Sequence, residues 1–253
     1  EFGHGMGLGA QTSTYGPAAD TDEAYLTAVL PAMRQAKSIA LYLPEIGKPE
    51  DLQKALDTAV DIVRVAVRAG AAKLAAAALS QVKRQGKTAV GFMMMSSPCS
   101  AAVLAQEAGL LSSYGADIVY ITDSAGAMLP HEVKDAVLAI RQAHPQVQVG
   151  FHGHNNLGLA ITNSLTAIEA GAAYIDCTLR GLGAGAGNAP TEVLALLLQR
   201  MGMDDSLDWN RLLHIAEQYI DPLLPAPPAL TNEMIMIGAQ GTVGNAVYVA
   251  GKK

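Results

Sequence analysis

Apolar and polar positions along the chain alternate between two kinds of segment. Short runs rich in β-branched and apolar residues are each followed by a longer, Ala-rich stretch with helical spacing. The runs begin about 22–30 residues apart, which is the spacing of βα units, and such alternation favours a parallel sheet. The predicted strands are 38–43, 62–67, 89–95, 118–122, 147–151 and 174–178. The predicted helices are 21–36, 49–59, 71–85, 100–114, 130–143, 159–170 and 190–201.

The number of strands favours a closed barrel. Near-continuous apolar strands are typical of a sheet that is covered on both faces. Six βα units and the end of a leading strand at 1–5 fall one short of eight, so we expect an α/β fold, a (β/α)₈ TIM barrel that lacks its first strand. An open doubly wound sheet is the alternative. The glycine run 183–188 disfavours it, because Asn188 stands where a dinucleotide-binding motif has its last glycine.

The character of the sequence changes after Asp221. Four prolines lie within the next seven residues, and they predict a linker rather than a helix. We therefore expect an N-terminally incomplete barrel domain over 1–221. A linker and the truncated start of a C-terminal helical region would follow over 222–253.

Composition narrows the classes of function. The 253 residues are 50% hydrophobic, and 17 Lys+Arg against 23 Asp+Glu give a net charge of −6. The apolar fraction excludes a disordered chain, and an acidic balance without a basic run disfavours nucleic acid as a partner. No apolar stretch approaches the length of a membrane span, and Cys99 and Cys177 form neither a disulfide framework nor a paired zinc motif. We expect a cytoplasmic enzyme that binds neither nucleic acid nor membrane.

Two histidines follow the fifth predicted strand. His152 and His154 are two residues apart, and strand side chains alternate between faces, so both point to the same side. Two imidazoles at the C-terminal mouth of a barrel form half of a divalent-metal site. Oxygen ligands would complete it, which favours Mn²⁺ or Mg²⁺ over Zn²⁺. The alternative is a pair of histidines that hydrogen-bond each other at a strand end.

Four other polar residues lie at informative positions. Asn188 either caps the following helix or faces the metal. Asp123 closes the strand at 118–122 and is interpreted as a turn residue, a partner of a ligand or a ligand itself, while Ser124 would hydrogen-bond a substrate carboxylate. Arg64 lies inside an apolar run, where burying a charge is costly, so we expect a carboxylate partner or a bound anion.

The pattern of residues resembles a known family. Two segments, 150–158 and 181–192, are similar to motifs of the metal-dependent pyruvate aldolases of the 4-hydroxy-2-oxovalerate aldolase type. These enzymes belong with the hydroxymethylglutaryl-CoA lyase and isopropylmalate synthase superfamily. The segments read Gly-Phe-His-Gly-His-Asn-Asn-Leu-Gly and Gly-Leu-Gly-Ala-Gly-Ala-Gly-Asn-Ala-Pro-Thr-Glu. The stretches 1–9, 88–95 and 120–128 extend the resemblance over nearly the whole chain.

The resemblance implies a carbon–carbon lyase of aromatic hydrocarbon catabolism. It would cleave 4-hydroxy-2-oxopentanoate, or a close 4-hydroxy-2-oxoacid, to pyruvate and an aldehyde through a metal-stabilised pyruvate enolate. The implied metal is Mn²⁺, with Mg²⁺ or another divalent ion as alternatives, held by two histidines and an aspartate; His152 and His154 match the histidines. Ser124 matches a position near bound pyruvate, and Asn188 an asparagine that approaches the metal. An acylating acetaldehyde dehydrogenase is the implied partner of the full-length family.

The chain departs from the family pattern in two places. The family's first strand carries an arginine and an aspartate, with a histidine shortly after; none has a match here, so the catalytic residues are unassigned. A family tyrosine has no counterpart in 238–243, and Tyr248 is out of register. Two alternatives therefore stay open. One is a catalytically incompetent barrel that acts as a binding module, and the other is an acyl-CoA-dependent Claisen synthase or lyase of the same superfamily.

Overall fold

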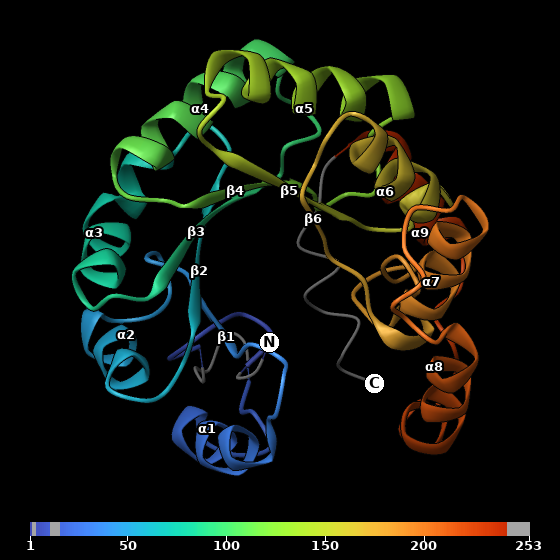
Figure 1. The fold of residues 1–253 in the computed structure, drawn as a ribbon, viewed down its shortest axis with the longest axis horizontal. Helices are drawn as coiled ribbons and strands as arrows, with labels where there is room; N and C mark the ends of the chain where they lie inside the picture. The colour runs from blue at the N-terminus through green and yellow to red at the C-terminus, as the bar shows by residue number, and fades with distance from the viewer. Residues whose placement is uncertain (2–3, 11–15, 242–253) are drawn as a thin grey trace. The chain divides into compact units, whose positions relative to one another are not determined.

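Parallel strands alternate with helices along the chain (Figure 1). The computed structural model describes residues 1, 4–10 and 16–241. The strands lie in one sheet in the order β1-β2-β3-β4-β5-β6. This order follows the chain and lacks the reversal that marks a doubly wound sheet. The predicted α/β alternation with a parallel sheet is confirmed. Residues 2–3 of the predicted leading strand lie outside the described residues, and so does Tyr248.

The elements have the following bounds. The strands are β1 Ile39–Tyr42, β2 Ile62–Arg68, β3 Thr88–Met94, β4 Ile118–Asp123, β5 Gln148–Gly153 and β6 Tyr174–Ile175. The α-helices are α1 Asp22–Val29, α2 Pro49–Leu56, α3 Ala76–Arg84, α4 Ala101–Ser113, α5 Pro130–Ala143, α6 Ala160–Glu169, α7 Thr191–Arg200, α8 Trp209–Ile215 and α9 Asn232–Gln240.

Three elements differ from the sequence prediction. The first helix ends at Val29 instead of 36, because Pro31 has no backbone N–H to continue the helical hydrogen bonds, and a 3₁₀ turn follows at Leu30–Ala32. Strand β6 has two residues instead of five. Helix α8 was not predicted; Asp208 caps it by accepting a hydrogen bond from the Arg211 amide at 3.0 Å.

The chain forms two compact units. The first consists of Glu1–Met94, Ala102–Ile121 and Ala139–Val149, and the second of Met95–Ala101, Thr122–Leu138 and Gly150–Lys253. The domain boundary at 221 stays a prediction. No helix among the described residues is both long and apolar enough to cross a membrane.

The first unit has an apolar interior that strands β1 to β4 build. Helices α2 and α3 lie along one side of β2 and β3 (Figure 1). Side chains from alternate strand positions pack against one another on the other side. This cluster is made up of Leu43, Ala66, Val90, Phe92, Ile118 and Tyr120.

The second unit carries the loops that follow β4, β5 and β6. After β6 the chain makes a 3₁₀ turn at Leu179–Gly181 and a glycine-rich loop before α7 begins. Past α8 it continues through a π-helical turn at Ala216–Ile220 and a 3₁₀ turn at Asp221–Leu223. Helix α9 packs Met234 and Ile237 on Ala186 of the glycine-rich loop. This unit contains all the predicted site residues.

Candidate metal centre

The two predicted histidines face each other at the end of β5. Their Nε2 atoms are 3.3 Å apart, and their rings meet edge to face with centroids 5.0 Å apart. The alternation of strand side chains is the cause, since His152 lies in the strand and His154 two positions later. The sequence prediction that both imidazoles lie on one side therefore agrees with this geometry.

The neighbours of each ring assign its tautomer. The Nδ1 atom of His152 lies 2.9 Å from Asp176 Oδ2, and Nδ1 of His154 lies 3.2 Å from the Ala184 carbonyl oxygen. Both partners are acceptors, so each Nδ1 carries a proton, and the two Nε2 atoms face each other. Burial, followed by the nearby His152, lowers the pKa of His154 to about 4. His154 is therefore neutral at pH 7, the form that binds a metal.

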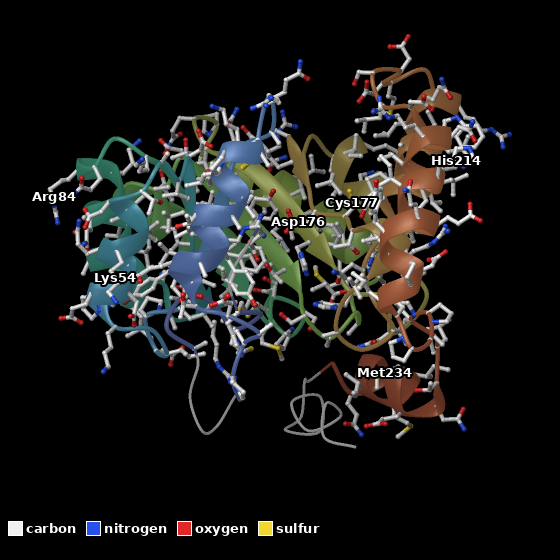
Figure 2. All side chains as sticks on the ribbon, turned by 90° about the horizontal axis from the view of Figure 1, so that it is seen from below. Lys54, Arg84, Asp176, Cys177, His214 and Met234 are labelled. Carbon is white, nitrogen blue, oxygen red and sulfur yellow. The ribbon has the colours of Figure 1, made fainter. Side chains whose placement is uncertain are left out.

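Asp176 is a site residue that sequence reasoning did not single out. It follows β6, next to Cys177 (Figure 2), and its carboxylate accepts a hydrogen bond from His152 Nδ1. Its side chain is 19% exposed. A carboxylate behind a histidine fixes the orientation of the ring and raises its basicity toward a metal. The sequence held only part of this signal: Asp176 follows the strand next to the histidine strand, but its contact with His152 depends on the register of the two strands.

Asn188 brings a third polar group to this region. It forms an isolated antiparallel bridge with His154 and is 8% exposed. Its Nδ2 donates to the Leu182 carbonyl at 3.2 Å, whereas its Oδ1 is buried and has no hydrogen-bond partner among the described residues. Helix α7 has Pro190 at its N-cap, with no side-chain cap. The helix-cap interpretation of Asn188 is therefore wrong, and its amide oxygen stays available as an acceptor.

Asn156 joins the loops that surround the histidines. Its Nδ2 donates to Ala125 O at 3.0 Å and its Oδ1 accepts from Ala186 N at 2.9 Å, so one side chain ties three loops together. Gly126, with φ +60°, lies so close to His154 that a Cβ would stand 2.8 Å from its carbonyl oxygen. Only glycine fits at such an approach. The loops therefore hold the histidines in a fixed frame.

Asp123 and Ser124 lie at the end of β4 in the same unit. Both carboxylate oxygens of Asp123 accept backbone amides, from Ala127 and Met128, each at 2.9 Å. These bonds form the turn, and burial raises the pKa of the Asp123 carboxyl. Ser124 Oγ accepts the Met95 amide at 3.0 Å. Its hydroxyl proton can therefore still be donated to a ligand.

The two histidines could contribute nitrogen ligands to a divalent cation. Two imidazole Nε2 atoms 3.3 Å apart can share a proton, and a divalent cation can take the place of that proton. A buried amide oxygen without a donor adds a hard oxygen ligand. Among the described residues no three His, Cys, Asp or Glu side chains form a metal-binding group, so the two histidines alone do not complete a site.

Comparison with known proteins shows which family this chain resembles. The HMGL-like family profile matches residues 13–218. The chain is 42% identical to 4-hydroxy-2-oxovalerate aldolase of Pseudomonas putida, over 99% of this chain and 72% of that protein. It is 46% identical to 4-hydroxy-2-oxovalerate aldolase 2 of Rhodococcus opacus strain B4, over 95% of this chain and 69% of that protein.

The chain belongs to the HMGL-like family of 4-hydroxy-2-oxovalerate aldolases. Solved structures agree on the fold. The N-terminal domain of a proposed aldolase from Bacteroides vulgatus has a TM-score of 0.77 at 27% identity, covering 92% of this chain and 81% of that one. Hydroxymethylglutaryl-CoA lyase of Bacillus subtilis has a TM-score of 0.70 at 19% identity, covering 85% and 80%. Both support the TIM-barrel prediction, and the aldolase relatives make this chain a member of a carbon–carbon lyase family.

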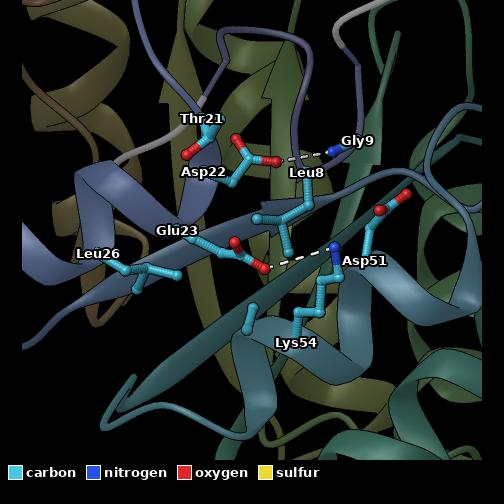
Figure 3. Close-up of a pocket in the computed structure, with 9 residues that line it drawn as sticks. Leu8, Gly9, Thr21, Asp22, Glu23, Leu26, Asp51 and Lys54 are labelled. Carbon is cyan, nitrogen blue, oxygen red and sulfur yellow. Dashed lines mark hydrogen bonds and ion pairs between the residues drawn. The ribbon is translucent and has the colours of Figure 1, made fainter.

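The first unit of this aldolase-family chain has a pocket of about 210 Å³ between α1 and α2 (Figure 3). Three carboxylates line it, and each already has a partner. Asp22 accepts the Gly9 amide at 2.9 Å, Glu23 pairs with Lys54 at 3.4 Å, and Asp51 accepts the Lys48 amide at 2.9 Å. These contacts cap helices and fix a turn. The pocket contains none of the predicted site residues.

Arg64 and Cys177 have structural roles. The guanidinium of Arg64 forms an ion pair with Glu1 at 3.1 Å and lies 4.7 Å from the ring centroids of both Phe92 and Tyr120. The predicted carboxylate partner of Arg64 is thus present inside the first unit. Burial raises the pKa of the Cys177 thiol, which disfavours the thiolate that a nucleophile would need.

Proposed function

We propose that this chain is a divalent-metal-dependent aldolase that cleaves 4-hydroxy-2-oxopentanoate to pyruvate and acetaldehyde. One observation carries the proposal: the Nε2 atoms of two histidines face each other at 3.3 Å, and His154 is bridged to Asn188, in a chain 42% identical to a 4-hydroxy-2-oxovalerate aldolase. His152 and His154 would hold the metal, with Asn188 as an oxygen ligand. We propose Mn²⁺ as the physiological ion and Mg²⁺ as the alternative.

The reaction is a retro-aldol cleavage. A base removes the proton of the 4-hydroxyl group, the C3–C4 bond breaks, and its electron pair passes to the 2-oxo group, leaving acetaldehyde and the enolate of pyruvate. Protonation at C3 then gives pyruvate. A bound divalent ion supplies Lewis acidity that polarises the 2-oxo group. The residue that acts as the base is not assigned.

The residues around the site have defined parts in this proposal. Asp176 accepts the hydrogen bond of His152 Nδ1 and orients the ring, so that His152 would hold a metal through Nε2. The Ala184 carbonyl does the same for His154. Ser124, whose oxygen already accepts the Met95 amide, donates its proton to the substrate carboxylate. Asp123 shapes the turn that places Ser124.

A partner enzyme and a metabolic role also follow from this function. An acylating acetaldehyde dehydrogenase would consume the aldehyde, and the chain would act in the cytoplasm on a product of aromatic hydrocarbon breakdown. The domain division at 221 belongs to the same proposal. The relatives named above are aldolases, and no contact among the described residues favours the binding module or the acyl-CoA enzyme. A second function is therefore not proposed.

The test is metal-dependent release of pyruvate from 4-hydroxy-2-oxopentanoate. We expect release with Mn²⁺, weaker release with Mg²⁺, and none after chelation or in the His154→Ala variant. Acetyl-CoA should not be required, which separates the aldolase from a Claisen enzyme. Release that persists at full rate in His154→Ala would refute the proposal, as would a wild-type chain that binds Mn²⁺ but releases no pyruvate.

A further inference from the structure

Arg180 adopts a backbone conformation that arginine rarely takes. Its φ and ψ are 58° and 13°, in the left-handed region, and Gly181 follows with φ 63°. Among the described residues only Met95 shares a positive φ without being glycine. Asparagine and glycine tolerate this region far better than a long side chain does. Something in the surroundings must therefore hold Arg180 in place.

Two carboxylates hold Arg180. Its backbone amide donates to both oxygens of Glu192, at 3.1 and 3.3 Å, and Glu192 is buried in the first turn of α7. Its guanidinium donates through Nε and Nη2 to the two oxygens of Asp221, each at 2.8 Å. This paired geometry is the strongest form of ion pair between side chains. The guanidinium also holds the pKa of the Asp221 carboxyl below its usual range.

The turn at Arg180 closes the glycine-rich loop that contacts the metal centre. The Gly181 amide donates to Thr178 O at 3.1 Å, and the Gly181 carbonyl accepts the Asn188 amide at 2.9 Å. The two ends of the loop are thereby joined next to Arg180. Within the loop, Ala184 O contacts His154 and Gly187 O accepts the Asn155 amide at 2.8 Å. The direction that the chain takes at Arg180 therefore sets where these groups lie.

Asp221 belongs to a different part of the unit. It begins the 3₁₀ turn Asp221–Leu223 after α8 and the π-helical turn. The paired hydrogen bonds thus link this helical segment, 41 residues further along the chain, to the entrance of the glycine-rich loop. The Asp221 side chain is 44% exposed and that of Arg180 27%. Because both side chains are partly exposed, Arg180 and Asp221 can be substituted without creating a cavity in the core.

We propose that Arg180 is a positioning residue for the metal centre: its ion pair with Asp221 anchors the glycine-rich loop to the segment after α8 and so holds Asn188 beside the histidines. The inference rests on the proposed function, because it takes the Asn188 oxygen as a metal ligand. Arg180 itself contacts neither metal nor substrate. It acts through the Gly181 carbonyl, which fixes the Asn188 backbone.

Four variants of the full 253-residue chain separate the contribution of the guanidinium from that of the left-handed backbone conformation. Arg180→Gly keeps the left-handed turn but removes the guanidinium, Arg180→Ala also forces an alanine into that turn, and Asp221→Asn removes the charge of the partner. Calorimetric titration with Mn²⁺ should show about tenfold weaker binding for Arg180→Gly, at least as large a loss for Arg180→Ala, and about threefold for Asp221→Asn. Arg180→Lys should recover part of the loss.

A second measurement does not depend on the metal. Amide hydrogen exchange of Gly181 and Asn188 in the metal-free protein should be faster in Arg180→Gly and in Asp221→Asn. The matched control is Lys83→Met, which breaks a 2.7 Å ion pair with Asp117 in the first unit at similar exposure, 43% and 37%. It should change neither Mn²⁺ affinity nor the exchange of these amides. A loss of stability alone would lower the melting temperature without weakening Mn²⁺ binding to the folded chain.

The outcomes are distinct. Unchanged Mn²⁺ affinity and unchanged exchange in both Arg180→Gly and Asp221→Asn would overturn the positioning role. If the wild-type chain binds no Mn²⁺, the proposed function and the metal part of this inference fail together. In that case the exchange rates alone decide whether Arg180 holds the loop. Faster exchange with weaker Mn²⁺ binding, absent in Lys83→Met, would support the inference.

Discussion

Each of the two units contains a polar group that is at least partly buried, and the two groups have different kinds of partner. In the first unit, the positive charge of Arg64 is matched by the Glu1 carboxylate and by the faces of Phe92 and Tyr120. In the second, the Nε2 atoms of His152 and His154 face each other, 3.3 Å apart. The charge of Arg64 is matched by a carboxylate of the same unit. The two imidazole nitrogens have room for a proton or a cation to bridge them.

The difference shows how structural and functional polar groups can be told apart. A buried charge that only stabilises the fold has its counter-charge and its packing from the same unit, because an unmatched charge is costly. A binding site instead has its ligand atoms held rigidly by outer partners while their binding sides are left for the ligand. Asp176 and the Ala184 carbonyl are such outer partners.

The largest effect should come from deleting one imidazole. We expect His152→Ala to weaken Mn²⁺ binding by about 100-fold or more, because it removes one of two nitrogen ligands and leaves the Asp176 carboxylate without its proton donor. Calorimetry on the purified chain measures it. His214→Ala, at an exposed position on α8 (Figure 2), is the control and should bind Mn²⁺ as the wild type does. Unchanged Mn²⁺ affinity in His152→Ala would show that His152 is not a metal ligand.

The second largest effect should be on the free energy of unfolding, with no effect on Mn²⁺ binding. Arg64→Met keeps much of the side-chain volume but removes the charge that Glu1 and the two rings surround. We expect the free energy of unfolding to drop by about 2–4 kcal/mol, with unchanged Mn²⁺ affinity. Urea denaturation and calorimetry measure the two quantities. A weaker Mn²⁺ affinity in this variant would show that the two groups are not independent, and the comparison would lose its basis.

Much of the fold could be predicted from the sequence, because each strand is a local apolar run. The runs at 62–67 and 118–122 correspond to β2 and β4 almost residue for residue. His152 and His154 could be placed on one side, since alternation along a strand is also local. Helix α8 was missed because no strand precedes it and it lies outside the alternation of strands and helices, although Asp208 caps it.

The rest of the site depends on contacts between distant segments. The sequence cannot show that Asp176 lies against His152, because that requires the register of β5 and β6. The sequence allowed Asn188 to be either a helix cap or a ligand. The structure excludes the cap, because α7 begins three residues later with Pro190 at its N-cap. The left-handed conformation of Arg180 has no sequence signal at all, since its cause is a pair of carboxylates 12 and 41 residues away.

A third effect concerns pH in the metal-free protein. The pKa of His154 is about 4 in the folded chain against an ordinary 6.5, so between these values the unfolded chain binds a proton that the folded chain does not. The free energy of unfolding should therefore fall as the pH drops from 6.5 to 4, by about 1–3 kcal/mol from this group. His154→Gln should lose that part of the slope. Identical pH dependence in wild type and variant would contradict a buried neutral His154.

The smallest effect should come from Ser124. Its oxygen accepts the Met95 amide at 3.0 Å, so Ser124→Ala leaves one amide without its acceptor and should cost about 1 kcal/mol of stability. Mn²⁺ affinity should be unchanged, because Ser124 is not among the proposed ligands. The KM for 4-hydroxy-2-oxopentanoate should rise several-fold, since the hydroxyl proton that would meet the substrate carboxylate is gone. Ser97→Ala, which removes a hydroxyl bonded to Gly241 O in the same unit, is the matched control. A KM that rises equally in both variants would assign the effect to general loosening of the loops and would remove Ser124 from the substrate site.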